Sequence, residues 1–164
     1  MFLIDANILI EAKNRYYAFD LAPGFWDWLE GAYRQDLVCS IEAVRDELLQ
    51  GNDELAEWTR ANPGLFRAID QPTTKHFQPL SQWAVSGAYR EEAINAFVGN
   101  HADYLLVAYA REHQHTVVTH ERSQPHSRKR ILIPDACLAM GVDTADTFEM
   151  MRETGVTLHL QKSP

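Results

Sequence analysis

Cysteine is scarce in this chain of 164 residues: it has only Cys39 and Cys137, and neither forms part of a C-x-x-C pair. A disulfide framework or a cysteine-ligated zinc site is therefore not expected, and both thiols are interpreted as small buried side chains. Long apolar runs are absent too, since no stretch approaches the roughly 18–20 residues that a membrane helix needs. The segment 1–5 has no basic residue and its apolar run ends at Asp5, which argues against a signal peptide. These absences predict a cytoplasmic protein that does not enter the membrane.

Positive charge is also in deficit, with 15 lysines and arginines against 23 aspartates and glutamates and a formal net charge of −8. Taken alone, this charge argues against binding to nucleic acid, because phosphates repel an acidic surface. The objection weakens if several carboxylates face divalent cations, since two such ions add about four positive charges. One basic run stands out, and it is interpreted either as a solvated loop or as a phosphate-binding segment. It contains Arg122, His126, Arg128, Lys129 and Arg130.

Several catalytic motifs are missing as well. The chain has no G-x-x-x-x-G-K-[ST] loop and no G-x-S-x-G sequence, so a nucleoside triphosphatase and a serine hydrolase lack support. The seven histidines match neither H-E-x-x-H nor a zinc-finger spacing. Most of them are interpreted as surface residues, and His120 is a candidate for a position near substrate because it adjoins Glu121.

What is present is an ordinary globular composition, 46 % apolar and 23 % charged, over a length that suits one domain spanning residues 1–164. Apolar runs predict strands at 2–4, 37–39 and 116–119, with candidate strands at 130–133 and 156–160 and either a short strand or irregular structure at 66–69. Helical periodicity predicts helices at 8–13, 23–34, 41–50, 53–60, 74–85, 91–97, 102–113 and 144–153. Ser40 is interpreted as the N-cap of the helix 41–50 and Gly51 as its C-terminal stop.

This alternation of strands and helices predicts an α/β fold of three layers, with a parallel sheet between two layers of helices. Ligands of such sheets bind at the carboxyl ends of the strands. Asp5 directly follows the first strand, with Asn7 two residues later, and Thr119 and Glu121 follow the strand 116–119. Each placement also has an ordinary structural explanation, which for Asp5 is an N-cap of the next helix.

Three more acids lie in comparable positions. Glu47 borders the apolar stripe of its helix, whereas Glu42 and Asp46 fall on the opposite, solvated face. Asp103 occupies the first turn of the helix 102–113, where the helix dipole favours a carboxylate. Asp135 follows the apolar segment 131–134 and has N-capping of the next helix as its alternative role. Gathered carboxylates repel one another unless a cation lies between them, and hard oxygen ligands suit Mg²⁺ or Mn²⁺.

These residues resemble a known family. The segment Asp5-Ala6-Asn7 after a strand resembles the opening motif of PIN domains, and the segments around Glu47, Asp103 and Glu121 resemble the later acidic motifs in the expected order. Finer features resemble one PIN-like branch of bacterial proteins, DUF4411. They are Phe25-Trp26, the run 47–55 before Trp58, and the run 133–137.

The resemblance implies a PIN fold and RNA cleavage that depends on Mg²⁺ or Mn²⁺, often by the toxin of a toxin–antitoxin pair. It implies that Asp5, Glu47 and Asp103 bind metal and act in catalysis. PIN nucleases usually place aspartate at the fourth position, where this chain has Glu121. The number of metal ions, one or two, is therefore left open, and so is whether Glu121 or Asp135 completes the site.

The first hypothesis is thus a metal-dependent endoribonuclease. Asn7 and Thr119 would support the metal ligands, and a cognate antitoxin would block the cleft. The side chains expected on the RNA backbone are Arg122, Arg128, Lys129 and Arg130. A homodimer is left open, because family habit favours one but no apolar stripe in the sequence demands it.

The rival hypothesis is a PIN-like module that binds RNA or protein without catalysis, in which the acids are helix caps and members of salt bridges. A phosphatase of the haloacid dehalogenase kind ranks below both. It needs a second aspartate two residues after the first, and Asn7 stands there.

Overall fold

The computed structural model describes residues 1–99 and 101–159, and the strands in this part of the chain form one parallel sheet. Across the sheet their order is β3-β2-β1-β4-β5. They are short and apolar, and β1 and β2 are buried along their whole length. The strands are β1 (Phe2–Ile4), β2 (Val38–Ile41), β3 (Phe66–Arg67), β4 (Thr116–Val118) and β5 (Thr144–Ala145).

Strand β1 lies at the centre of the sheet, and the order of the strands reverses there. The chain adds β2 and β3 on one side of β1, and later β4 and β5 on the other. Such a reversal opens a crevice at the carboxyl ends of the two strands that flank it. The backbone N–H of Asp5 donates to the carbonyl of Val118 at 3.2 Å, which holds the ends of β1 and β4 together.

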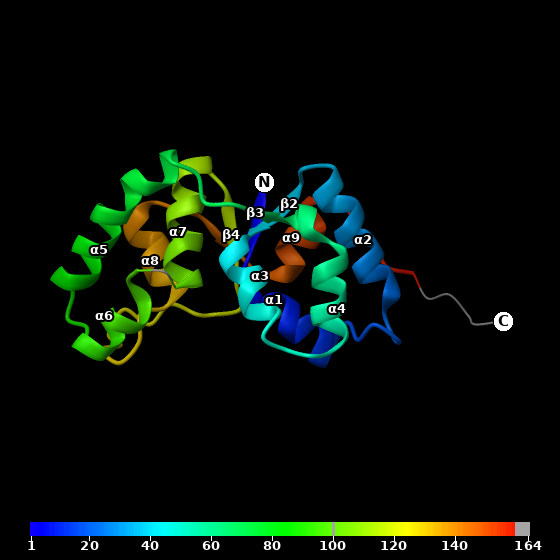
Figure 1. Ribbon diagram of the computed structural model, residues 1–164, viewed down its shortest axis with the longest axis horizontal. Coiled ribbons are helices and arrows are strands. Elements are labelled where there is room, and N and C mark those ends of the chain that lie inside the picture. The colour runs from blue at the N-terminus through cyan, green and yellow to red at the C-terminus, as the bar shows by residue number, and fades with distance from the viewer. Residues whose placement is uncertain (100, 160–164) are drawn as a thin grey trace.

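Helices cover both faces of the sheet, and Figure 1 shows α5, α6, α7 and α8 on one side of the strands and α1, α2, α4 and α9 on the other. The predicted three-layer α/β/α architecture is therefore confirmed. The α-helices are α1 (Ala6–Glu11), α2 (Pro23–Arg34), α3 (Glu42–Leu48), α4 (Glu54–Ala61), α5 (Phe77–Ser86), α6 (Glu91–Phe97), α7 (Ala102–His113), α8 (Ile133–Met140) and α9 (Thr147–Glu153). Shorter turns are η1 (Ala12–Tyr16), which is π-helical, and the 3₁₀ turns η2 (Pro63–Leu65) and η3 (Pro72–His76).

The helices with the clearest apolar periodicity match their predictions. Helices α2, α6 and α7 have the predicted bounds, and Phe25, Trp26 and Leu29 of α2 are buried as its pattern indicated. Burial of an apolar stripe stabilises a helix more than propensity does, so the stripe marks the helix reliably. Cys39 and Cys137 are both free and buried, as predicted. No helix among the described residues is long and apolar enough to cross a membrane.

The prediction for residues 40–51 was partly wrong. Ser40 belongs to β2, its hydroxyl donates to the carbonyl of Ile4 at 2.7 Å, and Ile41 occupies the N-cap position of α3. The helix ends at Leu48, before Gly51. Ser40 pairs with Phe66 of β3, and this sheet contact outweighs the local capping preference of serine.

Two of the predicted short strands were also wrong. Residues 130–132 form no strand, and Ile133 begins α8, whose first turn contains Pro134, a position that proline favours in helices. Residues 156–159 form no strand either, and Leu160 lies outside the described residues. The predicted helix 144–153 divides into β5 and α9, because Asp146 caps α9 through a capping box with Glu149.

Candidate functional site

Asp5 lies at the sheet crevice and is the most buried of the predicted acids, with 2 % of its surface exposed. Its Oδ2 accepts hydrogen bonds from Asn7 Nδ2 and from Thr119 Oγ1, both at 3.4 Å. It stands at the N-cap position of α1 but makes no side-chain capping bond, so the alternative role that the sequence allowed is not realised. Asn7 and Thr119 lie where the prediction of supporting residues needs them, in contact with Asp5.

The pKa of Asp5 is raised to about 7, first by burial and then by the negative charges of Asp103 and Glu121. The hydrogen bonds from Asn7 act in the opposite direction. Near neutral pH, the ionised form of this carboxyl group therefore costs free energy in the folded protein. Carboxylates with raised pKa values are common at functional sites.

Asp103 and Glu47 enter the same site from two helices that pack against each other, α7 and α3. The pKa of Asp103 is raised by its burial and by the charge of Glu121, and lowered by Arg130 and His101. Glu47 is exposed over much of its side chain, yet partial burial of its carboxylate and the charge of Asp103 raise its pKa. The charges of Asp5, Asp103 and Glu121 thus interact electrostatically, and the charge of Glu47 interacts with that of Asp103.

Glu42 and Asp46 of α3 are directed elsewhere, as the helix pattern predicted. Both form ion pairs with Arg45, and their side chains are 45 % and 66 % exposed. Among the described residues, the acids do not surround a single point at which an ion could bind. Within residues 1–99 and 101–159, no three Asp, Glu, His or Cys side chains stand close enough to hold one ion as they are placed.

Glu121 is nearly buried and both of its oxygens have partners. Oε1 accepts from Arg130 Nη2 at 2.6 Å, and Oε2 accepts from the backbone N–H of Ile133 at 2.8 Å. The Glu121 side chain is 12 % exposed, against 61 % for Arg130. The carboxylate therefore fastens the far end of the loop 119–132 to its beginning, while it lies close enough to raise the pKa of Asp5.

Asp135, the other residue considered for the fourth acid, has a different environment. Its Oδ1 accepts from Ser123 Oγ at 2.5 Å and its Oδ2 from the backbone N–H of Gln124 at 3.1 Å. It lies in the first turn of α8, where it makes no capping bond. Asp135 holds the middle of the loop 119–132, and only Glu121 of these two acids acts electrostatically on Asp5.

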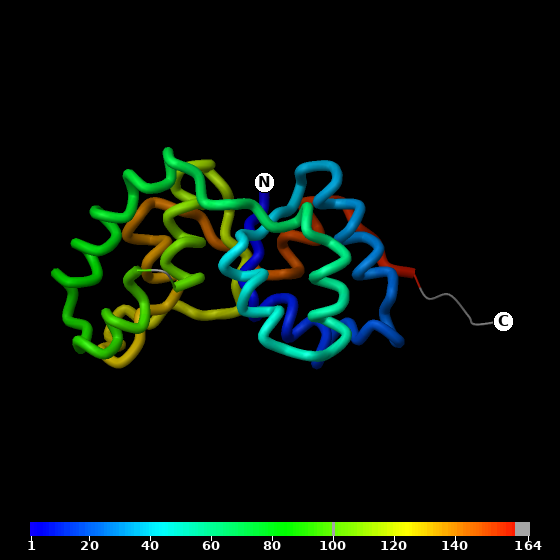
Figure 2. The backbone as a smooth tube through the Cα atoms, in the orientation of Figure 1, coloured from blue at the N-terminus to red at the C-terminus, as the bar shows by residue number. Residues whose placement is uncertain are grey.

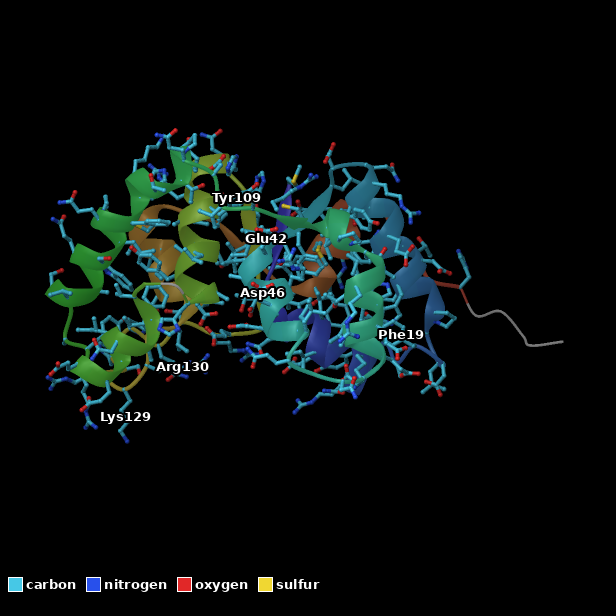
Figure 3. All side chains as sticks on the ribbon, in the orientation of Figure 1. Phe19, Glu42, Asp46, Tyr109, Lys129 and Arg130 are labelled. Carbon is cyan, nitrogen blue, oxygen red and sulfur yellow. The ribbon has the colours of Figure 1, made fainter. Side chains whose placement is uncertain are left out.

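The predicted phosphate-binding residues are spread along this loop, which Figure 2 shows as a yellow tube running from β4 toward the side of the molecule that carries α5 and α6. Arg128 Nε donates to the carbonyl of Ala88 at 2.8 Å and so anchors the loop. Arg130 is paired with Glu121. Arg122 and Lys129 are exposed, and neither has an ion pair within the described part of the chain. In Figure 3, Lys129 and Arg130 both lie at the lower edge of the molecule.

A cleft of about 420 Å³ opens beside the acids. Thr119 and Glu121 line it, together with residues that the sequence reasoning did not select: Glu11, Arg15, Tyr16 and Phe148. His120, predicted near substrate, also lines it, with Nδ1 2.5 Å from Glu11 Oε2 and Nε2 2.8 Å from Thr147 Oγ1. No local signal marks Arg15 and Tyr16, because the π-helical turn η1 that carries them has no recognised sequence pattern.

The fold has a counterpart among solved structures. The chain resembles "FitAcB from Neisseria gonorrhoeae", with a TM-score of 0.50 and 16 % identity, over 88 % of this chain and 96 % of that one. At this identity the likeness shows the fold alone, a PIN-like three-layer α/β/α arrangement around a parallel sheet. No curated protein matches the sequence. The family DUF4411, a domain of unknown function, matches residues 2–158, and this chain therefore belongs to the DUF4411 family.

Proposed function

We propose that this chain is a metal-dependent endoribonuclease, a hydrolase of RNA phosphodiester bonds. The observation that supports the proposal most is the position of Asp5. It is buried at the central crevice of a PIN-like sheet, and its pKa is raised to about 7 by burial and by the charges of Asp103 and Glu121. These carboxylates come from segments far apart in the sequence, and the sheet edge gathers them where ligands of such folds bind.

The donor set fits a hard divalent cation such as Mg²⁺ or Mn²⁺. All of the acids offer oxygen, and their mutual repulsion is what a bound cation would relieve. Asp5, Glu47 and Asp103 would hold the ion, with Glu121 as a fourth ligand if its bond to Arg130 opens. When bound, the ion would supply Lewis-acid charge to a phosphodiester and an activated water for its hydrolysis.

The remaining side chains have positioning roles in this proposal. Thr119 and Asn7 donate to Asp5 and so fix the orientation of its carboxylate. Glu121 holds Arg130 beside Asp103, where the guanidinium already lowers the pKa of Asp103. RNA phosphates would be met by Arg122 and Lys129, the two exposed cations of the loop without an ion pair or an anchoring bond among the described residues, and this contact would offset part of the formal charge of −8.

The biological role that we propose is the toxin of a toxin–antitoxin pair, acting in the cytoplasm and held inactive by a cognate antitoxin. This part of the proposal rests on the resemblance of the acidic motifs to PIN domains. A homodimer also remains part of the proposal.

One alternative is favoured by a specific observation. Both oxygens of Glu121 are engaged, and the acids of the described residues do not converge into a set of three around one point. A PIN-like module that binds RNA or protein without cutting it would have the same arrangement. In such a module, the acids would serve only to fasten the loop and the helices.

Cleavage of a mixed RNA pool by the purified full chain tests the proposal. We expect cutting with Mn²⁺ or Mg²⁺, no cutting in EDTA, and none by the Asp5→Ala variant with metal. Asp46→Ala is the matched control, because it removes an exposed acid of α3 whose one partner among the described residues is Arg45. Absence of cutting by the folded parent protein, or full activity of Asp5→Ala, would instead favour the binding module.

A further inference from the structure

The cleft beside Asp5 has a composition that the proposed cleavage chemistry does not require. Its floor is the segment 119–122 after β4, and its walls come from α1 with η1 and from the start of α9. Thr119 connects it to the acids, because its hydroxyl lies 3.4 Å from Asp5 Oδ2. The volume of about 420 Å³ is in the range of sites for small ligands.

The acids that line the cleft are all engaged with neighbours. Glu11 contacts His120, and Glu121 is paired with Arg130. Asp146 accepts from the backbone N–H of Glu149 in the capping box of α9. Each of these acids therefore already has a partner within the fold.

The cations of the cleft are not engaged in this way. Arg15 and Arg122 are exposed, and among the residues that the structure describes neither has a salt bridge. An arginine that keeps its five donors free at the mouth of a cleft is suited to phosphate, which it can bind in a bidentate manner. Two such arginines can bind an anionic group here, beside the three acids that already have partners.

Two aromatic rings lie in the same cleft with much of their surface in solvent. Tyr16 is 54 % exposed and Phe148 is 49 % exposed, one from η1 and the other from α9. The rings of Tyr16 and His120 form a T-shaped pair with their centroids 6.1 Å apart, and His120 is itself held by Glu11 and Thr147. Tyr16 is thus a supported ring with a free surface, as a stacking platform for a nucleobase needs.

We propose that this cleft binds one unpaired nucleotide of single-stranded RNA, with the base stacked on Tyr16, Phe148 beside it, and the phosphates held by Arg15 and Arg122. The inference rests on the proposed function, since it places this nucleotide next to the bond that is cut at Asp5. Unstacked bases are available in single strands and not in a duplex, so the cleft selects single-stranded RNA.

Binding without cleavage tests this site. The full chain in EDTA is titrated into a fluorescein-labelled single-stranded oligoribonucleotide of mixed sequence, and the dissociation constant is read from fluorescence anisotropy. We expect Tyr16→Ala to weaken binding by roughly 5- to 150-fold, the range for loss of one base–aromatic stack, and Tyr16→Phe to bind like the parent. We expect Phe148→Ala to weaken binding as well, whereas Leu21→Ala removes a side chain that is 81 % exposed outside the cleft and should have no effect. Arg15→Ala should lower the salt dependence of binding by about one phosphate contact.

Equal binding by the parent, Tyr16→Ala and Phe148→Ala, each with an unchanged melting temperature, would overturn the site. Equal binding of duplex and single-stranded RNA would overturn it too. Cleavage by the same variants in Mn²⁺ separates this inference from the proposed function. Tyr16-dependent binding without any cleavage would support the nucleotide-binding cleft and contradict the nuclease. Cleavage without Tyr16-dependent binding would support the nuclease and contradict the nucleotide-binding cleft.

Discussion

At the scale of single residues, Asp5 is the side chain whose environment departs most from that of a free carboxylate in water. Burial, Asp103 and Glu121 all favour its neutral form, and only Asn7 opposes them. Its pKa is therefore raised above the ordinary value of 3.8 to about 7, and this difference connects protonation of Asp5 to folding.

The first prediction is a pH dependence of stability in EDTA. Between pH 3.8 and about 7, Asp5 is ionised in the unfolded chain and protonated in the folded one, so the free energy of unfolding should fall as the pH rises. The fall is about 1.4 kcal/mol for each unit by which the two pKa values differ. Urea unfolding at several pH values measures it. Asp5→Asn should be the more stable protein near pH 7 and should show a shallower slope, and an unchanged slope would contradict the assignment.

The second prediction concerns the pair of Glu121 and Arg130. Arg130 is 61 % exposed, so water screens the pair and its contribution to stability should be at most about 1 kcal/mol. In a double-mutant cycle, Glu121→Gln and Arg130→Ala should therefore be coupled weakly in stability. We expect stronger coupling in RNA cleavage if Glu121 acts by positioning Arg130. Independent effects on the cleavage rate would instead indicate that Glu121 acts directly as a metal ligand.

At the scale of elements, the loop 119–132 determines how the site is arranged. It begins at Thr119, which contacts Asp5. Asp135 of α8 binds the N–H of Gln124 within the loop, and Glu121 binds the N–H of Ile133, where the loop meets α8. Arg128 ties it to Ala88. The loop carries Glu121, the predicted phosphate-binding residues and the floor of the cleft, so its anchors should influence all of them.

The third prediction is that Asp135→Ala destabilises this loop. The carboxylate is 6 % exposed and accepts from Ser123 and Gln124, and its removal leaves the N–H of Gln124 without its partner. We expect a loss of about 1–3 kcal/mol in the free energy of unfolding and reduced RNA cleavage. Urea denaturation measures the first and the cleavage assay the second. Ser123→Ala, which removes only the hydroxyl donor, should cost less, and equal losses for both variants would contradict this assignment.

Some elements could be predicted from the sequence and others could not. Helices α2, α6 and α7 were predictable because their apolar positions repeat over several turns. Ser40 and the segment 130–133 were not, because serine suits a cap as well as a strand, and the run of three apolar residues after Arg130 suits a strand as well as the start of a helix. In both cases a contact from a distant segment decided the outcome, namely Ile4 with Ser40 and Glu121 with the N–H of Ile133.

At the scale of the whole molecule, the fold brings negative charges together in a protein whose formal charge is already −8. Burial, and after it the charges of neighbouring acids, raise the pKa values of Asp5, Glu47 and Asp103. Without a cation, the folded state therefore holds carboxylates that are partly desolvated and that repel one another. A ligand that binds only the folded state stabilises it by mass action, and a divalent cation at these acids would do so.

The fourth prediction follows from this repulsion. Mn²⁺ should raise the melting temperature of the parent protein, with an effect that saturates with the metal concentration. The shift should disappear in Asp5→Ala and persist in Asp46→Ala, because Asp46 lies on the solvated side of α3. Differential scanning fluorimetry measures it. An equal shift in all three proteins would indicate weak binding of ions over the acidic surface and would argue against a site at Asp5.

The sequence by itself determined the α/β class, the location of Asp5, Asn7 and Thr119 near the sheet edge, and the place of Asp103 in the first turn of its helix. It could do so because strand and helix periodicities are local, and parallel strands always end at a common edge. Tertiary structure alone decided that Glu121 is paired with Arg130, that Asp135 holds the loop, and that Arg15, Tyr16 and Phe148 meet in one cleft. These contacts join segments separated by loops and a π-helical turn, whose paths depend on packing against the rest of the molecule and leave no periodic signal in the chain.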